Sequence, residues 1–203
     1  MKKIIIPLLF VIVAISCGPN THITKSWRDP SATIDNSKLN KVLISAFMKD
    51  ETSRRVVEQT LVDRMKGKGV SSFTYFGGTN PKDDGTLEQK LKGDGFDGAV
   101  VLRFLNMDKE LNYVPGTSTY PGYYSRYGGY YYNSWGAYSS PGYYTEDKVY
   151  NIETNIYSLK ADSSKLIWSG VTQTTNPSKL DKMVTEIADV VNEKMRKEGF
   201  LVN

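Results

Sequence analysis

The chain has 203 residues, with 26 basic and 22 acidic side chains and a formal net charge of +4. This even balance, without a clustered basic stripe, argues against a nucleic-acid partner. A hydrophobic content of 39% and a charged content of 24% are typical of a globular domain with a sizeable core.

Residues 1–16 have the pattern of a secretory signal peptide. Lys2 and Lys3 form a basic start, an apolar run covers residues 4–15, and small Ser16 ends it. The run is shorter than the roughly 20 residues that span a bilayer as a helix, so we expect no permanent transmembrane segment. Removal of the signal lowers the basic count from 26 to 24, against 22 acidic residues.

Cys17 is the only cysteine of the chain and follows this run directly. The stretch Val13-Ala14-Ile15-Ser16-Cys17 resembles the lipobox of bacterial lipoproteins, although that family more often has Leu or Val where Ala14 stands. The resemblance implies that Cys17 is the lipidation site, carries acyl chains such as palmitate, and begins a tether over residues 17–38. The alternative is an ordinary cleaved signal followed by a free or buried cysteine.

The residue after the cysteine bears on the cellular location. In the lipoprotein family, an Asp at this position holds the protein in the inner membrane of many Gram-negative bacteria, and here the residue is Gly18. The resemblance therefore implies a cell-envelope protein anchored in the outer membrane and facing the periplasm, with surface display as an alternative.

The first half of the chain predicts a parallel α/β arrangement. In the tether, residues 23–27 offer an alternative as an edge strand, and we expect Trp27 to pack on the domain. Buried strands are predicted at residues 41–47, 70–76 and 99–105, and helices at residues 53–67 and 86–92. This alternation of strands and helices is typical of right-handed crossovers in a parallel sheet.

The second half predicts a hairpin and a long helix. Strands over residues 149–159 and 166–174 flank a turn at residues 161–164, which favours antiparallel pairing. A final helix begins near Asn176-Pro177 or Ser178, ends at Gly199, and is followed by Phe200 folding back on its last turn. Its apolar face contains Leu180, Met183, Val184, Ile187, Ala188, Val191 and Met195.

The predicted fold class is therefore α/β: residues 39–203 form one domain with a mixed sheet. The sheet combines a parallel βαβαβ portion with the C-terminal antiparallel hairpin, and helices pack on it. The stretch Gly95-Phe96-Asp97-Gly98-Ala99-Val100-Val101 resembles the start of a buried strand in small periplasmic lipoprotein domains, including the N-terminal domain of the TolB translocation protein. The resemblance covers residues 41–200 without the insertion described next. It implies a role in envelope assembly or binding and transfers no catalytic residues.

Residues 113–146 are predicted to be a flexible insertion between two core strands. Eleven of the 14 tyrosines lie between Tyr113 and Tyr144, among Gly, Ser and Pro, and Arg126 is the only charged residue there. The insertion is either a passive loop or a contact surface, because tyrosine gives a large contact area at a small entropy cost. The candidate partner-binding residues are Tyr120, Tyr123, Tyr124, Tyr127, Tyr130, Tyr131, Tyr132, Trp135, Tyr138, Tyr143 and Tyr144. Their targets would be an envelope protein, a glycan or another copy of the insertion.

Candidate catalytic groups are few. His22 is the only histidine and lies in the tether, so neither a nucleophile–histidine pair nor a histidine metal site is expected. Asp83 and Asp84 are expected at a helix start, and Asp94 and Asp97 in a turn. We expect no cofactor besides the covalent lipid. The leading hypothesis is a non-enzymatic binding or assembly factor of the envelope; the alternative is a carboxylate-dependent hydrolase of cell-wall glycan that uses Asp94 and Asp97.

Overall fold

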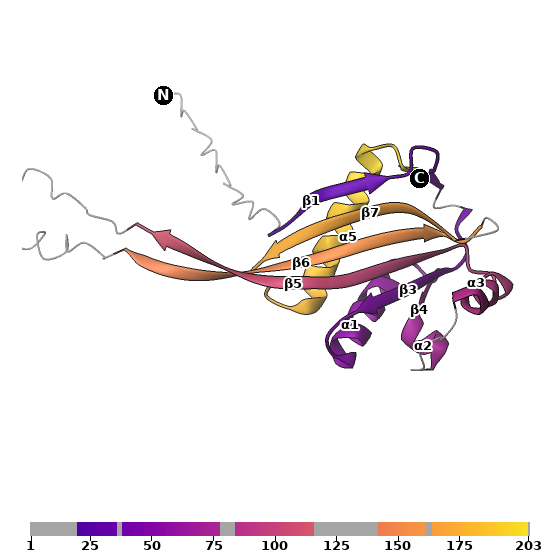
Figure 1. Cartoon of the computed structure of the whole chain (residues 1–203), viewed down its shortest axis with the longest axis horizontal. Helices are drawn as coiled ribbons and strands as arrows, with labels where there is room; N and C mark the ends of the chain where they lie inside the picture. Colours follow the sequence, from indigo (N-terminus) through magenta and orange to yellow (C-terminus); the bar gives the residue numbers. More distant parts are fainter. Residues whose placement is uncertain (1–19, 36–37, 78–83, 116–141, 161–163, 203) are drawn as a thin grey trace, which may run out of the picture.

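A six-stranded mixed sheet, in the order β1-β7-β6-β5-β3-β4, organises the computed structural model (Figure 1). The model describes residues 20–35, 38–77, 84–115, 142–160 and 164–202. The strands are β1 (Thr21–Arg28), β3 (Val42–Phe47), β4 (Gly69–Ser71), β5 (Gly98–Val114), β6 (Tyr143–Ser158) and β7 (Lys165–Thr175). β3 pairs in parallel with β4 and β5, whereas β5, β6, β7 and β1 pair antiparallel. The mixed α/β fold predicted from the sequence is confirmed.

Helices cover both faces of the parallel part of the sheet. α1 (Glu51–Arg64) packs on one face, and α2 (Ser72–Phe76) and α3 (Asp84–Gly93) lie on the other. Asp50 caps α1, because its carboxylate accepts the Ser53 amide proton at 2.8 Å. β3 is consequently buried on both sides, as its continuous apolar run predicts: Val42 and Ile44 face α1, and Leu43 faces α3.

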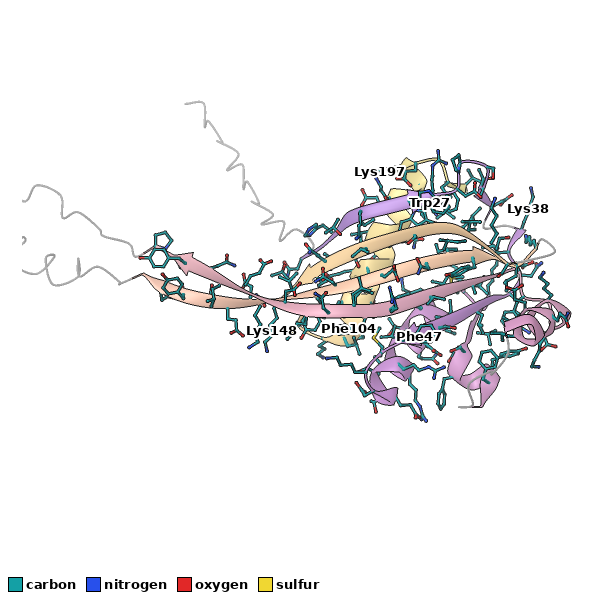
Figure 2. The ribbon with its side chains drawn as sticks, in the orientation of Figure 1. Trp27, Lys38, Phe47, Phe104, Lys148 and Lys197 are labelled. Carbon is teal, nitrogen blue, oxygen red and sulfur yellow. The ribbon has the colours of Figure 1, made fainter. Side chains whose placement is uncertain are left out.

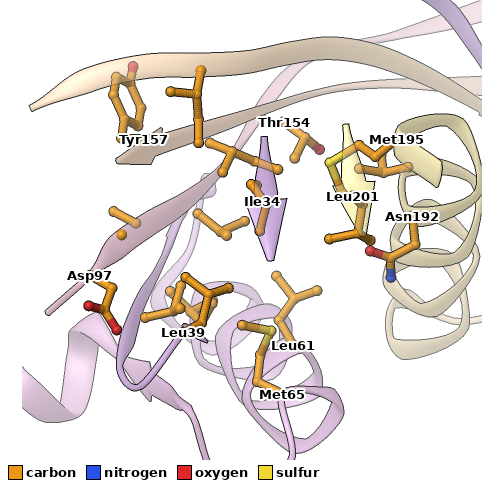
Figure 3. Close-up of a pocket in the computed structure, with 18 of the residues that line it drawn as sticks. Ile34, Leu39, Leu61, Met65, Asp97, Thr154, Tyr157, Asn192, Met195 and Leu201 are labelled. Carbon is orange, nitrogen blue, oxygen red and sulfur yellow. The ribbon is translucent and has the colours of Figure 1, made fainter. Parts of the chain in front are cut away.

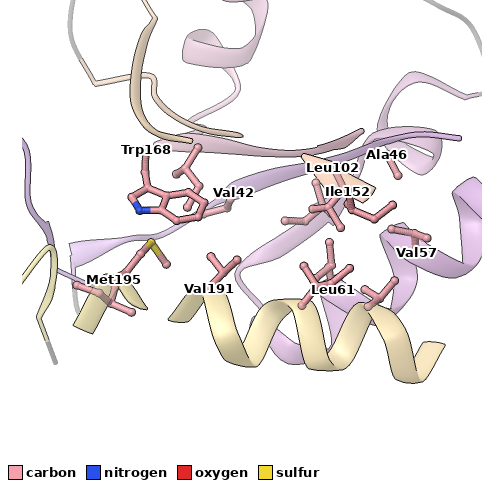
Figure 4. Close-up of a cluster of buried hydrophobic side chains, with 14 of the residues drawn as sticks. Val42, Ala46, Val57, Leu61, Leu102, Ile152, Trp168, Val191 and Met195 are labelled. Carbon is pink, nitrogen blue, oxygen red and sulfur yellow. The ribbon is translucent and has the colours of Figure 1, made fainter. Parts of the chain in front are cut away.

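The long C-terminal helix α5 (Leu180–Lys197) lies across the antiparallel part of the sheet, on the same face as α1 (Figures 1 and 4). Its predicted apolar stripe is confirmed, since Met183, Val184, Ile187, Val191 and Met195 are all buried. The helix begins one residue later than predicted: its N-cap is Lys179, whose side chain makes no capping bond. Gly199 has a φ of 66°, and the Phe200 amide returns to the Met195 carbonyl at 2.9 Å, which confirms the predicted ending.

A second, two-stranded parallel ladder was not predicted. β2 (Ile34–Asp35) pairs with β8 (Leu201–Val202), directly after the fully buried Phe200. Two residues per strand are too few to show a hydrophobic period, so the sequence carries no signal for this pairing. The ladder ties the end of α5 to the segment that leads into β3.

The predicted strand over residues 70–76 is wrong from Ser72 onward. β4 ends at Ser71, and residues 72–76 form the short helix α2. Ser71 is the N-cap of this helix, and buried Glu58 of α1 accepts the Phe73 amide proton at 2.8 Å. The aromatic and β-branched residues of this segment favour a strand. The helix forms instead because Ser71 caps it and the Glu58 carboxylate, from a distant segment, accepts one of its first amide protons.

Much of the predicted tether is instead the edge strand β1, so the alternative for residues 23–27 is confirmed. Thr21 is buried and its hydroxyl lies 2.8 Å from the Thr174 hydroxyl and 2.7 Å from Glu186. Trp27, expected to pack on the domain, is 51% exposed on the sheet face away from α5. His22 is exposed within this strand.

β5 and β6 run much farther than predicted. They stay paired to Val114 and Tyr143, so the first two and last four residues of the predicted insertion, 113–114 and 143–146, belong to strands. β3 ends opposite Arg103, and β7 ends opposite Val149. Beyond these points β5 and β6 form a two-stranded β-ribbon, residues 109–114 and 143–148, that projects from the body of the protein (Figure 1). Within the described part of the chain, no helix is long and apolar enough to cross a membrane.

Candidate functional site

The structure offers two candidate sites, and the first is a cavity of about 640 Å³ on the α1 and α5 side of the sheet (Figure 3). α1 and α5 pack against each other; α1 also packs on β3 and β4, and α5 on β1, β7 and β8. The cavity lies between these two helices, over β3, β5 and β6, and the β2–β8 ladder forms part of its wall. Its size lies within the range of about 300–1,000 Å³ that is usual for small-molecule sites.

The inner wall of this cavity is apolar. It is made by aliphatic and thioether side chains from every surrounding element, including Ile34, Val42, Ile44, Leu61, Met65, Leu102, Ile156, Ile187, Val191, Met195 and Leu201. Of the polar residues that line the cavity, Thr154 of β6 is the one that is buried, with 3% exposure. Its hydroxyl has no hydrogen-bond partner among the described residues. An apolar pocket with one buried polar group therefore lies inside the domain.

Charged side chains surround the mouth of the cavity. Lys38 pairs with Asp35 at 3.2 Å, and Lys160 lies 3.9 Å from Asp97. Arg64 pairs with Asp189 of α5 across the two helices. These exposed pairs contribute little to stability individually. The rim of the cavity therefore carries both positive and negative side chains, whereas the buried residues that line it are uncharged.

The second candidate site is the β5–β6 ribbon (Figure 2). One of its faces presents Leu111 and Tyr144, each 71% exposed, beside Tyr113, which is 56% exposed. The Tyr113 and Tyr144 rings stack at a tilt, with their centroids 5.1 Å apart. Tyr143, on the other face, is 58% exposed. The end of the ribbon is thus rich in uncovered apolar and aromatic surface.

Of the predicted contact residues, Tyr143 and Tyr144 lie at this end of the ribbon and are exposed. Several others lie outside the described residues: Tyr120, Tyr123, Tyr124, Tyr127, Tyr130, Tyr131, Tyr132, Trp135 and Tyr138. The predicted lipidation site Cys17 also lies outside them. Residues 115–142 connect β5 to β6 at the tip of the ribbon. This tip is the end of the two strands that lies far from the cavity.

The two candidate catalytic carboxylates do not share a cavity. Asp97 lines the mouth of the pocket, and its carboxylate accepts the amide protons of Asn40 and Lys41, at 2.5 and 3.2 Å. Asp94 is not among the residues that line the pocket; its carboxylate binds the Tyr75 hydroxyl and Lys90. These two partners hold the pKa of Asp94 below its usual value, the opposite of what a general acid requires. Asp94 thus links α2 with α3, and Asp97 holds the segment before β3, which gives the hydrolase hypothesis no support.

Sequence reasoning missed a buried carboxylate, Glu58 of α1. It is fully buried and accepts five hydrogen bonds, from the Ala46 and Phe73 amides, the Arg54 guanidinium and the Ser71 and Ser72 hydroxyls. Burial alone would raise its pKa, but these hydrogen bonds outweigh burial and the pKa is lowered. Glu58 thus joins α1, β3 and α2 as an ionised structural group.

A signal for Glu58 was present in the sequence. Val57, Leu61 and Met65 lie on the apolar stripe of α1, and Glu58 falls within that stripe at helical spacing. A charged residue in such a position needs partners. Among the described residues, no group of three or more His, Cys, Asp and Glu side chains is arranged to hold a metal ion.

Comparisons with known proteins give little further guidance. Neither a family model nor a curated protein matches this chain. Similar solved structures include the PelC dodecamer from Paraburkholderia phytofirmans, with a TM-score of 0.41 and 10% identity, covering 84% of this chain and 94% of that one. Lipoprotein GNA1162 from Neisseria meningitidis has a TM-score of 0.37 and 8% identity, covering 77% and 98%. The hypothetical protein CT253 from Chlamydia trachomatis has a TM-score of 0.35 and 8% identity, covering 67% and 72%. At such scores these likenesses carry no argument about function.

Proposed function

We propose that this chain is a lipid-anchored protein of the bacterial envelope that acts by binding, with the β5–β6 ribbon as its contact arm. The observation that carries the proposal is the uncovered apolar surface of Leu111, Tyr113 and Tyr144 at the end of the ribbon. Cys17 directly follows the signal-like segment. It would carry the lipid, because residues 13–17 resemble a lipobox.

The physics of the ribbon favours a partner. A two-stranded ribbon without a third strand or a helix is only marginally stable in water. Side chains such as Leu111 and Tyr144 gain free energy when a partner covers them, at roughly 25 cal/mol per Å² of apolar surface. Tyrosine side chains add hydrogen-bonding hydroxyls and stacking faces, which suit an envelope protein or a glycan.

The test is photo-crosslinking in intact cells. A photoreactive phenylalanine analogue replaces Tyr144 at the end of the ribbon or, as a matched control, Glu193 on the exposed side of α5. We expect a discrete adduct from position 144 and none from position 193. Identical adducts from both positions, or no adduct from either, would contradict the proposal.

A second variant separates the ribbon from the insertion that it carries. Residues 115–142 are replaced by Asn-Gly, a two-residue turn of the kind that closes antiparallel hairpins. If the adduct from position 144 persists in this variant, the ribbon itself makes the contact. If the adduct is lost while the domain remains folded, residues 115–142 are required for it.

Lipidation is measured separately, by the mass of the mature N-terminal peptide. We expect an acylated Cys17 in the natural chain and an unmodified N-terminus in a Cys17→Ala variant that is still exported. A natural chain without acyl groups would contradict the anchor while leaving the contact arm to be judged by its adducts.

A further inference from the structure

The cavity between α1 and α5 has features that internal packing does not explain. It has a volume of about 640 Å³ and opens to solvent at a charged mouth, so packing within the domain leaves its apolar wall uncovered. Thr154 also lines it, and the Thr154 hydroxyl is buried without a partner among the described residues. An unsatisfied buried hydroxyl costs about 1–3 kcal/mol, so both features lower the stability of the empty domain.

Water is a poor occupant for the inner part of this cavity. A buried water is stabilised by about three hydrogen bonds to protein groups. Leu102 lies opposite Thr154 on β5, and Met195 and Leu201 also line the cavity (Figure 3). None of the three offers a strong side-chain partner. A ligand with an apolar body and one oxygen atom would satisfy the hydroxyl and the apolar wall together.

The charge distribution restricts the ligand further. Lys38, Arg64 and Lys160 lie at the mouth and are paired with acidic residues, and the inner wall contains no charged side chain. Burial of an ionised group beside Thr154 would therefore be strongly unfavourable. The oxygen that reaches Thr154 has to be neutral, as in an ester, an amide or an alcohol.

We propose that this cavity binds a single aliphatic chain that carries a neutral oxygen, the chemistry of an esterified fatty acyl group. The chain lies along Val42, Ile44 and Val191, and the oxygen accepts a hydrogen bond from the Thr154 hydroxyl. This site is independent of lipid attachment at Cys17 and of the ribbon, so its test does not depend on either.

The binding test uses the mature full-length protein and the neutral fluorescent probe N-phenyl-1-naphthylamine. Methyl laurate, tridecane and lauric acid compete for the probe; they have similar chain lengths but differ in their oxygen and charge. We expect methyl laurate to bind about five- to tenfold more tightly than tridecane, as one buried hydrogen bond implies. Lauric acid at neutral pH is expected to bind more weakly than its ester.

Thr154→Val and Thr172→Val form a matched pair of variants. Both threonines are buried on the same face of neighbouring strands, but the Thr172 hydroxyl donates to the Ile152 carbonyl at 3.2 Å and does not line the cavity. Thr154→Val is expected to raise the Tm of the ligand-free protein and to remove the preference for methyl laurate over tridecane. Thr172→Val is expected to lower the Tm and to keep that preference.

Three results would overturn the proposal. The first is a probe that is not displaced by either methyl laurate or tridecane. The second is a Thr154→Val protein that keeps the full preference for the ester, since the hydroxyl would then not contact the ligand. The third is tighter binding of lauric acid than of methyl laurate, which would place an anionic head group at the mouth instead.

A filling variant checks the location of the site. Ala188 of α5 is half-buried and lines the cavity, so Ala188→Leu extends a side chain into the space that the chain would occupy. We expect the protein to keep its Tm within a few degrees and to lose probe binding by at least tenfold. Unchanged probe affinity in a folded Ala188→Leu protein would place the probe elsewhere and contradict this location.

Discussion

At the scale of single residues, Glu58 is a buried ionised group with a structural role. Its carboxylate accepts hydrogen bonds from β3, α1, β4 and α2, and it has no exposed surface. A buried charge is tolerated only when hydrogen bonds replace the lost water, and five donors do so here. Because those donors come from four elements, the position of α2 depends on this one side chain.

Glu58→Gln is therefore expected to destabilise the domain by about 2–4 kcal/mol, because the amide group turns one hydrogen-bond acceptor into a donor facing other donors. The measurement is the free energy of unfolding in urea. Glu51→Gln on the same helix is the control: Glu51 is exposed and forms an ion pair with Arg55, so a loss below about 1 kcal/mol is expected. Equal losses in the two variants would contradict the structural role of Glu58.

Asp29 gives the stability a defined dependence on pH. Hydrogen bonds from Lys165 and Ser31 lower its pKa from 3.8 to about 2. A carboxylate whose pKa is depressed by folding stabilises the folded state above its unfolded pKa, and this contribution is lost as the pH falls through the folded value. The contribution of Asp29 is thus complete above about pH 4 and lost between about pH 4 and pH 2.

Asp29→Asn is expected to be less stable than the natural chain at pH 7, and the difference between them should shrink as the pH falls from 4 to 2. Thermal melts across this range measure it. Glu110→Gln on the exposed ribbon removes the same charge and corrects for the change in net charge. A stability difference that stays constant down to pH 2 would refute the role of Asp29.

At the scale of elements, Asn176 holds the base of the ribbon. Its side chain accepts the Lys148 amide proton at 2.9 Å and donates to Asp147 at 2.6 Å. Its backbone amide donates to the Lys148 carbonyl at 2.9 Å, and its φ of 47° lies in the left-handed region that Asn tolerates. Asn176 thus stands in for the missing third strand at the point where β7 ends.

Asn176→Gly keeps this backbone conformation and removes the side chain. We expect amide exchange at Lys148 and along the ribbon to speed up about five- to tenfold, because one hydrogen bond is lost at its base. Exchange in β3 serves as the internal reference and should not change. If the ribbon amides exchange at their original rates, the ribbon is held by other contacts.

The sequence is informative wherever an element is decided by its own residues. The apolar run of β3 and the stripe of α5 identify both elements, because burial imposes a period that the residues must follow. The full length of β5 has a weaker signal: Leu105, Met107, Leu111 and Tyr113 occupy alternate positions, but Lys109 interrupts this period. α2 and the β2–β8 ladder depend on contacts with distant segments, which no local pattern contains.

At the scale of the whole molecule, the cavity could not be predicted from the sequence. Val42, Leu61 and Val191 look like ordinary core residues in any pattern, and only the three-dimensional arrangement of α1, α5 and the sheet leaves a cavity beside them. The role of Thr154 could not be predicted either, because threonine is common in strands. Only the structure shows that its hydroxyl has no partner among the described residues. The exposed tyrosines were predictable, because their composition alone argues against a buried core.

The sheet also fixes how the ribbon and the N-terminal segment are related. Thr21, at the start of β1, lies in one row of the sheet with Thr174, Tyr150 and Met107, just before the ribbon begins. Cys17 is four residues from Thr21 and cannot lie more than about 14 Å from it along an extended chain. With the proposed lipid at Cys17, the ribbon starts at the membrane-proximal end, and the cavity mouth near Asp97 and Tyr157 lies at the other end of the sheet. The lipid anchor would then confine the ribbon to a thin layer beside the bilayer. Partners that are themselves held in this layer reach the ribbon by lateral diffusion, and their effective concentration at the ribbon is raised.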